Sequence, residues 1–234
     1  MECINIAVSL TKNDFNRQIK LLRKYTSKIK FLEIRADTFY PEKENITKIL
    51  TKISPLIKQK KISTILTFRS FSEGGKIKLS PQKITNFVSQ ILHENQKHIN
   101  FIDIEINLRN KKQLINTTKK YNKKIIYSVH YLNNNEDTNI DKIRKLKIKN
   151  KGYHILKIVA KIDSFNKYFE TLKNLKHKNY HNTTFFTVGK TSLLSRLISV
   201  ILKMPLVFVS LAKPVIKSQP DIKTFLSSIH KIGY

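Results

Sequence analysis

The chain alternates between short apolar runs and longer lysine-rich stretches from one end to the other. The short runs are rich in β-branched and aromatic residues, which favours strands, whereas the longer stretches are amphipathic and favour helices. Alternation of this kind is typical of βα units that build a parallel sheet. The pattern predicts eight strands, which are Ile4–Ser9, Lys30–Arg35, Ser63–Arg69, Asn100–Glu105, Lys124–His130, His154–Val159, Asn182–Thr187 and Leu206–Val209.

Amphipathic segments fill the intervals between these strands. The repeat is about thirty residues, close to that of a minimal (β/α)8 barrel, the TIM barrel. No linker rich in proline, glycine or serine interrupts the repeat, so we expect residues 1–234 to form a single α/β domain with the (β/α)8-barrel fold. The predicted helices include Asp14–Lys28, Pro81–His93, Thr138–Ile148 and Thr191–Leu202, with Asp221–His230 as the closing helix.

Several predicted strands carry polar residues at every second position near their C-terminal ends. Residues of one parity share a face of a strand, and strands of a parallel sheet are normally apolar on both faces. The active site of a barrel lies at this end of its strands, so we expect these side chains to converge there. They are Ser9, Glu33, Arg35, Thr67, Arg69, Asp103, Glu105, Ser128 and His130. The alternative is an ion-pair network that only holds strands together, which accounts for Glu33 with Arg35 but poorly for the whole set.

Lys157 lies within Ile155–Val159, a run that would otherwise be a fully apolar core strand. Burial and nearby cations such as Arg69 disfavour an ammonium group, so we expect an uncharged amine able to attack a carbonyl. The alternative is a lysine whose stem is buried while its charged end reaches solvent. His130, at the end of the preceding strand, favours the catalytic interpretation, because imidazole acts as acid and base near neutral pH.

Two glycine-containing turns follow predicted strands. Gly74 and Gly75 permit a tight turn after the third strand, which places the Glu73 carboxylate at the barrel mouth, where it can orient the imidazole. Gly189 with the lysine and threonine that follow it is similar to the end of a phosphate-binding loop. Thr184 occupies the position of that loop's first glycine, so we do not expect nucleotide binding.

The formal net charge is +29, with 45 lysine and arginine residues against 16 aspartate and glutamate residues. Such a charge is compatible with nucleic acid or an anionic membrane as a partner. Basic residues are spread through nearly every segment, however, which indicates a bias of the whole composition. We therefore expect no nucleic-acid and no membrane partner, although the positive field would attract a small anionic substrate.

Cys3 is the only cysteine in the chain. It can form no internal disulfide and no thiolate zinc site, so a reducing compartment fits best. We recognise no export leader, and no run approaches the roughly 18 continuous apolar residues of a membrane-spanning helix. The sequence therefore predicts a soluble, cytoplasmic protein without a metal or an organic cofactor, and a homodimer is kept as a candidate assembly.

Taken together, the motifs resemble those of type I 3-dehydroquinate dehydratases, in the family's order from Ser9 to about Phe208. Any one motif is weak, but six that coincide with strand ends are specific. The motifs are Leu32-Glu33-Ile34-Arg35-Ala36-Asp37, Leu66-Thr67-Phe68-Arg69-Ser70 with Glu73-Gly74-Gly75, Asp103-Ile104-Glu105, Ser128-Val129-His130, Leu156-Lys157-Ile158 and Ser195-Arg196.

The resemblance implies dehydration of 3-dehydroquinate to 3-dehydroshikimate, a step of the shikimate pathway to aromatic amino acids. It implies that Lys157 forms a Schiff base with the substrate ketone, that His130 moves the protons, and that Glu73 positions the imidazole. Arg196 would hold the substrate carboxylate, ideally as a bidentate pair. The implied substrate-binding residues are Ser9, Glu33, Arg35, Arg69, Arg196 and Gln219.

The sequence departs from the family after the eighth strand. The family has a Ser-Ala-Pro-Gly-Gln segment there that closes over the substrate, whereas this chain reads Val215-Ile216-Lys217-Ser218-Gln219. Gln219 can still reach the carboxylate, but the family's serine and its proline–glycine turn are lost. Because lids exclude water and complete such sites, we predict reduced affinity with the chemistry retained. A Michaelis constant in the family's usual range would contradict this.

Two other functions remain open at this stage. One is a lysine-imine aldolase on the same barrel, which would share Lys157 but usually needs a phosphate site after strands seven and eight. The chain supplies Gly189 there and no second phosphate loop. The other is a catalytically idle basic binding module, which would retain DNA in a salt-dependent way and fail with every carbonyl substrate.

Overall fold

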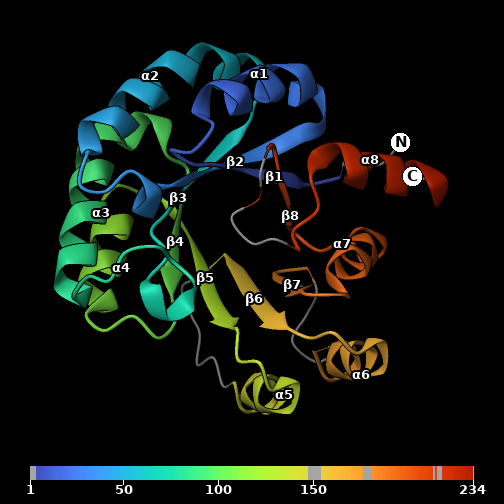
Figure 1. The fold of residues 1–234 in the computed structure, drawn as a ribbon. Coiled ribbons are helices and arrows are strands. Elements are labelled where there is room, and N and C mark those ends of the chain that lie inside the picture. The colour runs from blue at the N-terminus through green and yellow to red at the C-terminus, as the bar shows by residue number, and fades with distance from the viewer. Residues whose placement is uncertain (1–3, 147–153, 176–180, 213, 215–217, 234) are drawn as a thin grey trace.

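A ring of parallel strands lies inside a ring of helices, as Figure 1 shows. The structure is a computed structural model and describes residues 4–146, 154–175, 181–212, 214 and 218–233. The strands are β1 (Ile6–Leu10), β2 (Ile29–Arg35), β3 (Ser63–Thr67), β4 (Phe101–Glu105), β5 (Lys124–Tyr131), β6 (Ile155–Lys161), β7 (Thr183–Val188) and β8 (Val207–Ser210). The helices are α1 (Phe15–Tyr25), α2 (Lys43–Gln59), α3 (Pro81–Asn95), α4 (Lys111–Lys120), α5 (Glu136–Lys145), α6 (Phe165–Leu175), α7 (Ser192–Ile201) and α8 (Ile222–Lys231). The prediction of a (β/α)8 barrel is confirmed.

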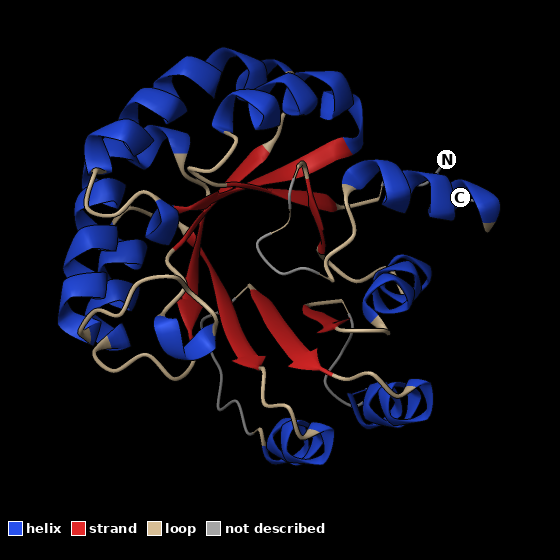
Figure 2. Cartoon of the chain, in the orientation of Figure 1, coloured by secondary structure: helices blue, strands red, loops and turns tan. Residues whose placement is uncertain are grey.

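The strands follow the order β7-β6-β5-β4-β3-β2-β1-β8, and Figure 2 shows them in red inside the blue helices. The described parts of β7 and β8 share no backbone ladder, and side chains bridge them instead. The Thr184 hydroxyl donates to the Leu206 carbonyl and accepts from the Leu206 amide, both at 3.1 Å. Arg196 of α7 donates to the carbonyls of Thr187 on β7 and Phe208 on β8. These two side chains therefore close the barrel at the β7–β8 seam.

Several predicted boundaries differ from the observed ones by two or three residues; β1 begins at Ile6 rather than Ile4, for example, and α1 ends at Tyr25 rather than Lys28. β3 ends at Thr67 rather than Arg69, because the amides of Arg69 and Ser70 donate to the side-chain carboxylates of Asp37 and Glu105 instead of continuing the sheet. β6 runs two residues further than predicted, to Lys161. Helix α5 spans Glu136–Lys145, and the last two residues of the predicted helix, 147 and 148, lie outside the described residues.

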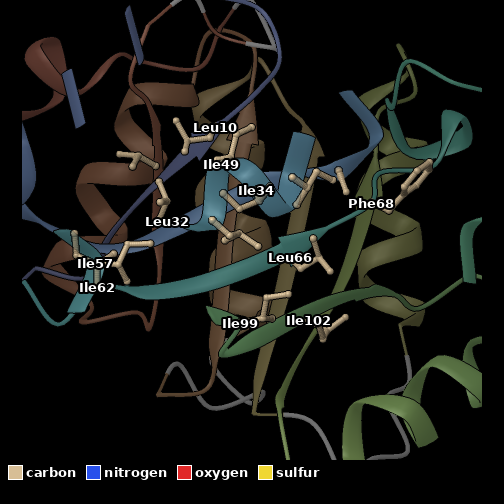
Figure 3. Close-up of a cluster of buried hydrophobic side chains, with 14 of the residues drawn as sticks. Leu10, Leu32, Ile34, Ile49, Ile57, Ile62, Leu66, Phe68, Ile99 and Ile102 are labelled. Carbon is tan, nitrogen blue, oxygen red and sulfur yellow. The ribbon is translucent and has the colours of Figure 1, made fainter. Parts of the chain in front are cut away.

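The outer faces of the strands pack against the helices in the main apolar core, part of which Figure 3 shows. Leu32 and Ile34 of β2 lie in this core with Ile49 of α2, each at most 8% exposed. Full burial of one such side chain contributes about 1.5–3 kcal/mol. Glu33 and Arg35 occupy the opposite face of β2 and point into the barrel. The alternation predicted from the sequence is therefore confirmed for this strand.

A second apolar cluster fills the barrel interior and includes the first residues of several strands. Phe101 and Ile155 begin β4 and β6, and Leu206 directly precedes β8. Other members of the cluster, Val159, Phe186, Val188 and Phe208, lie later along the strands beside polar side chains of the same inward faces. The cluster therefore forms the floor of the barrel and part of the wall at the C-terminal ends, where barrels build their sites.

Among the helices that the structure describes, none is both long and apolar enough to cross a membrane.

Candidate active site

One pocket at the C-terminal ends of the strands collects nearly all of the predicted site residues. Glu73 lies directly behind this lining, in contact with His130. Aromatic and aliphatic side chains complete the wall. The lining residues are Ser9, Glu33, Arg35, Arg69, His130, Lys157, Val159, Phe186, Val188, Arg196, Phe208 and Gln219.

Lys157 is the buried centre of the pocket, with 4% of its surface exposed. Its Nζ lies 3.1 Å from Asp103 Oδ2 and 3.5 Å from Glu33 Oε1. The side chain does not extend to solvent, so the alternative of a surface-reaching lysine is excluded. Inward positions of β2 and β4 therefore bring two carboxylates to this nitrogen, whereas the expectation from the sequence considered only neighbouring cations. The uncharged amine stays a prediction.

The two carboxylates beside Lys157 are held as anions. Burial by itself would raise the pKa of Asp103, but Arg69 and Lys157 outweigh it, and the pKa is lowered. The same balance lowers the pKa of Glu33, where Lys157 and Arg35 oppose the effect of burial. Glu33 is fixed further by hydrogen bonds from the hydroxyls of Ser9 and Thr67. The end of β2 that lines the pocket therefore presents an oriented negative charge.

His130 and Glu73 form a hydrogen-bonded pair, with 2.9 Å between Nδ1 and Oε2. Burial, reinforced by Arg69 and Lys157, lowers the pKa of His130 well below its usual value, so its imidazole is neutral. Burial raises the pKa of Glu73 to about 8, although Arg69 opposes this shift. Glu73 Oε1 is buried without a hydrogen-bond partner among the described residues, which also disfavours the carboxylate. Near neutral pH the proton of this pair therefore lies on Glu73 and not on the imidazole as a second proton.

Arg69 links the carboxylates of the site to one another. Its Nη1 donates to Glu73 at 3.2 Å and to Glu105 and Ser128 at 3.0 Å each, and its Nη2 donates to Asp103 at 3.0 Å. Although burial opposes it, the surrounding carboxylates raise the pKa of Arg69 above its usual value. Because acceptors of the protein occupy these donors, the role that the structure supports for Arg69 is to hold the carboxylates of the site in place.

Arg35 is held by the carboxylate of one neighbour, Asp37. Its Nε and Nη2 each donate to an oxygen of Asp37 at 2.8 Å, which is a bidentate pair. The pair fixes the guanidinium at the edge of the pocket, where it lines the wall beside Glu33.

Arg196 is a buried cation, and no described carboxylate forms an ion pair with it. Its Nε donates to the Phe208 carbonyl at 2.6 Å, and its Nη1 donates to the carbonyls of Thr187 and Ser192 at 3.0 and 2.8 Å. Its guanidinium carbon lies 4.7 Å from the ring centroid of Phe186. Burial lowers the pKa of Arg196 to about 9. Because burying a charge without a counterion is costly, this position is suited to an anionic ligand.

Gln219 lines the pocket as predicted, but most of the predicted lid, residues 215–217, lies outside the described residues. Ser218 is described, and its hydroxyl accepts a hydrogen bond of 2.9 Å from the Gly189 amide. Gly189 has a φ of +100° and makes the turn between β7 and α7, as expected. Ser218 of the predicted lid is therefore anchored to this turn.

The residues that the resemblance implied for the site leave out several side chains that the structure places there. Asp103 and Ser128 hydrogen-bond to each other and to the groups around Lys157, and their inward parity had marked them as candidates. Phe208 lies with its ring centroid 4.0 Å from Lys157 Nζ. No sequence signal distinguished Phe208, because an aromatic residue on a core strand normally indicates packing.

Within the described ranges, no group of three or more His, Cys, Asp or Glu side chains is arranged to hold a metal ion. The chemistry that the described side chains themselves offer is that of an amine, an imidazole and fixed charges.

Comparison with known proteins identifies relatives of this chain. A 3-dehydroquinate dehydratase of Staphylococcus haemolyticus is 22% identical over 167 residues, which covers 68% of this chain and 68% of that protein. Among solved structures, a type I 3-dehydroquinate dehydratase of Clostridium difficile superposes with a TM-score of 0.74 and 21% identity, covering 99% of this chain and 93% of that one. The 3-dehydroquinate dehydratase of Aquifex aeolicus gives 0.72 and 22%, covering 99% of each chain. The model of the family described as type I 3-dehydroquinase matches residues 6–232. The chain therefore belongs to the type I 3-dehydroquinase family.

Proposed function

We infer that the protein is a 3-dehydroquinate dehydratase, a hydro-lyase that acts through a Schiff base on Lys157. The observation that carries this inference is the shared pocket of three groups: a buried lysine, a neutral histidine and an arginine without a carboxylate partner among the described residues. A carbonyl compound that also bears a carboxylate and a leaving hydroxyl is the substrate such a set requires. Membership of the type I 3-dehydroquinase family supports this assignment.

The first half of the reaction builds the Schiff base. The Lys157 ammonium passes a proton to a neighbouring carboxylate, of which Asp103 at 3.1 Å is the nearer. The free amine adds to the substrate ketone, and the carbonyl oxygen takes one proton from the nitrogen and one back from the carboxyl group, so that it leaves as water when the carbon–oxygen bond breaks. The product of this half is a protonated imine, which draws electrons from the adjacent carbon and acidifies its C–H bond.

The second half eliminates the hydroxyl group. The His130 imidazole takes the proton from the acidified carbon, and the electron pair forms the new double bond as the carbon–oxygen bond of the hydroxyl breaks. The imidazolium then returns its proton to the departing oxygen, so that water leaves. Hydrolysis of the imine releases 3-dehydroshikimate and restores the amine. In this scheme Glu73 positions His130, and Arg196 holds the substrate carboxylate, with Gln219 beside it.

Reduction with borohydride in the presence of 3-dehydroquinate tests the scheme directly. Hydride converts an imine into a stable secondary amine, and peptide mass mapping then locates the added mass. We expect the label on Lys157 and none when a sugar phosphate replaces 3-dehydroquinate. A label on another residue would overturn the proposed mechanism, and a label with the sugar phosphate alone would favour the aldolase.

The pH dependence of kcat/KM is expected to follow the ionisation of Glu73. Below a pH of about 8, to which burial raises the pKa of Glu73, this residue is protonated and donates to His130 Nδ1, which leaves the other ring nitrogen protonated and unable to act as a base. Above it, the carboxylate accepts from Nδ1–H and frees that nitrogen. We therefore expect kcat/KM to rise about tenfold per pH unit up to this value and then level off. Steady-state rates between pH 6 and 9 measure this.

The matched variant for the pH profile is Glu73→Gln. Its side chain accepts the same hydrogen bond through the amide oxygen but does not ionise. We expect this variant to lose the rising limb, whatever its absolute rate. If kcat/KM rose at the same pH in the variant and in the unmodified protein, the titrating group would be one other than Glu73.

Arg196→Lys is expected to raise KM for 3-dehydroquinate by about 10- to 100-fold, with a much smaller effect on kcat, because a hydrogen bond to a charged group is lost. Lysine keeps the charge but not the planar pair of donors. A substrate analogue without the carboxylate serves as the control and should bind the two proteins equally. Since Arg196 also bridges the β7–β8 seam, a thermal melt must accompany the kinetics. An unchanged KM in the folded variant would refute the carboxylate role.

Three further expectations from the sequence stay predictions. Weaker substrate binding through the altered lid is one, and its measure is KM. A cytoplasmic location and assembly as a homodimer are the others, and fractionation of cells and sedimentation of the purified chain are the corresponding measurements.

A further inference from the structure

The amino nitrogen of Lys157 has an aromatic neighbour in addition to its two carboxylates. Nζ lies 4.0 Å from the ring centroid of Phe208, over the face of the ring. Phe208 is 3% exposed and Lys157 is 4% exposed, so water has little access to the contact. The ring face carries a partial negative charge, and its attraction for a cation is strongest where both partners are desolvated.

The contacts of this nitrogen change when the imine forms. An ammonium group offers three N–H donors, which can serve Asp103, Glu33 and one further acceptor. A protonated imine retains one N–H, because the carbon of the substrate replaces the others. In the structure this nitrogen donates to Asp103 and forms an ion pair with Glu33, whereas the imine can donate to at most one of the two carboxylates. The attraction of the ring depends on the charge and needs no N–H, so it persists.

We propose that Phe208 stabilises the cationic imine at Lys157 Nζ and is thereby a further catalytic residue of this site. The proposal rests on the proposed function, since it concerns the intermediate of that reaction. It assigns to a core residue of β8 an attraction to the nitrogen that does not depend on the number of its hydrogens.

The position of the ring is fixed from several sides. Its backbone pairs with Ala7 of β1, and its carbonyl accepts the hydrogen bond from Arg196 Nε. The ring packs against Phe186, with 5.8 Å between centroids and 42° between planes. Arg196 lies over Phe186 as Lys157 lies over Phe208. The two rings therefore separate the imine-forming cation from the cation proposed to bind the carboxylate.

The test replaces Phe208 with phenylalanines that carry one, two or three ring fluorines. Each fluorine withdraws electron density from the ring face while hardly changing its volume. The readout is the equilibrium constant for imine formation between Lys157 and 3-dehydroshikimate, measured by borohydride trapping at several ligand concentrations. We expect the constant to fall stepwise with fluorination, by about 10- to 30-fold over the series, as weakening of a desolvated cation–π contact implies.

Two natural substitutions separate this effect from packing. Phe208→Leu removes the ring and should lower imine formation, and Phe208→Tyr keeps a ring and should restore it. Phe101→Leu is the matched control, because Phe101 belongs to the same interior cluster as Phe208 but lies at the start of β4. It should lose stability without a change in imine formation.

The outcomes distinguish this inference from the proposed function. An equal constant for all of the fluorinated rings overturns the role of Phe208 while leaving the Schiff base in place. Absence of any imine on Lys157 in the unmodified protein overturns the proposed function, and the inference with it. A stepwise fall, together with an unaffected Phe101→Leu variant, supports the inference.

Discussion

Lys157→Met is expected to lower kcat by at least about 10,000-fold, because it removes the only group in the pocket proposed to bind the substrate covalently. Methionine preserves the length and apolar body of the side chain and lacks a nucleophile. The remaining His130 and Arg196 can still bind substrate and move protons, but the adjacent carbon is no longer acidified. Steady-state assays with 3-dehydroquinate, with borohydride trapping in parallel, measure the loss.

The same substitution also removes a counterion from Glu33 and Asp103, so folding must be checked by thermal melting. Lys161→Met is the matched control. Lys161 is on the same strand, but its Nζ donates to Asn134 in an exposed contact. We expect near-normal kcat from the control. Substantial activity of Lys157→Met with 3-dehydroquinate would exclude the Schiff-base mechanism.

Arg69→Met is expected to destabilise the fold by about 3–5 kcal/mol, the usual cost of leaving buried carboxylates without their cation. The guanidinium is the shared partner of Glu73, Asp103 and Glu105, each of which is at most 5% exposed. Urea unfolding at pH 7 gives the free energy of unfolding for the two proteins.

A pH series tests the cause of this loss. In the unmodified protein the folded-state pKa of Asp103 is lowered, so its contribution to stability is present above the unfolded value and is lost as the pH falls through the folded one. In Arg69→Met the carboxylates lack their cation and take up protons more readily, so lower pH should reduce the difference between the proteins. Arg144→Met is the control, since its ion pairs are exposed and should contribute about 0–1 kcal/mol. A difference independent of pH would point to lost packing instead.

The repeat of apolar and polar stretches was sufficient to predict the barrel. Because each βα unit is encoded locally, the period of two along a strand and the amphipathic helices could be recognised without any long-range information. Which residues of a strand face inward also follows from local alternation, so the sequence could place Glu33, His130 and Lys157 on inward faces, and the structure brings them into one pocket.

What parity cannot determine is which atoms meet across the barrel. From the sequence, Lys157 was expected to be a desolvated amine near cations. The folded chain also brings Asp103 and Glu33 to it, and these residues lie too far away in the sequence for a local pattern to connect them with Lys157. Phe208 was indistinguishable from a packing residue until its ring was found over Nζ.

Arg196 shows the same division between local pattern and tertiary contact. The sequence alone placed Arg196 after β7, and the resemblance implied that it holds the carboxylate of the substrate. Only the folded chain shows that its guanidinium also joins β7 to β8 across the seam. A sequence thus determines the faces that side chains occupy, because those depend on neighbouring backbone angles. Charge states and partners depend on distances between separate strands, and these exist only once the barrel has closed.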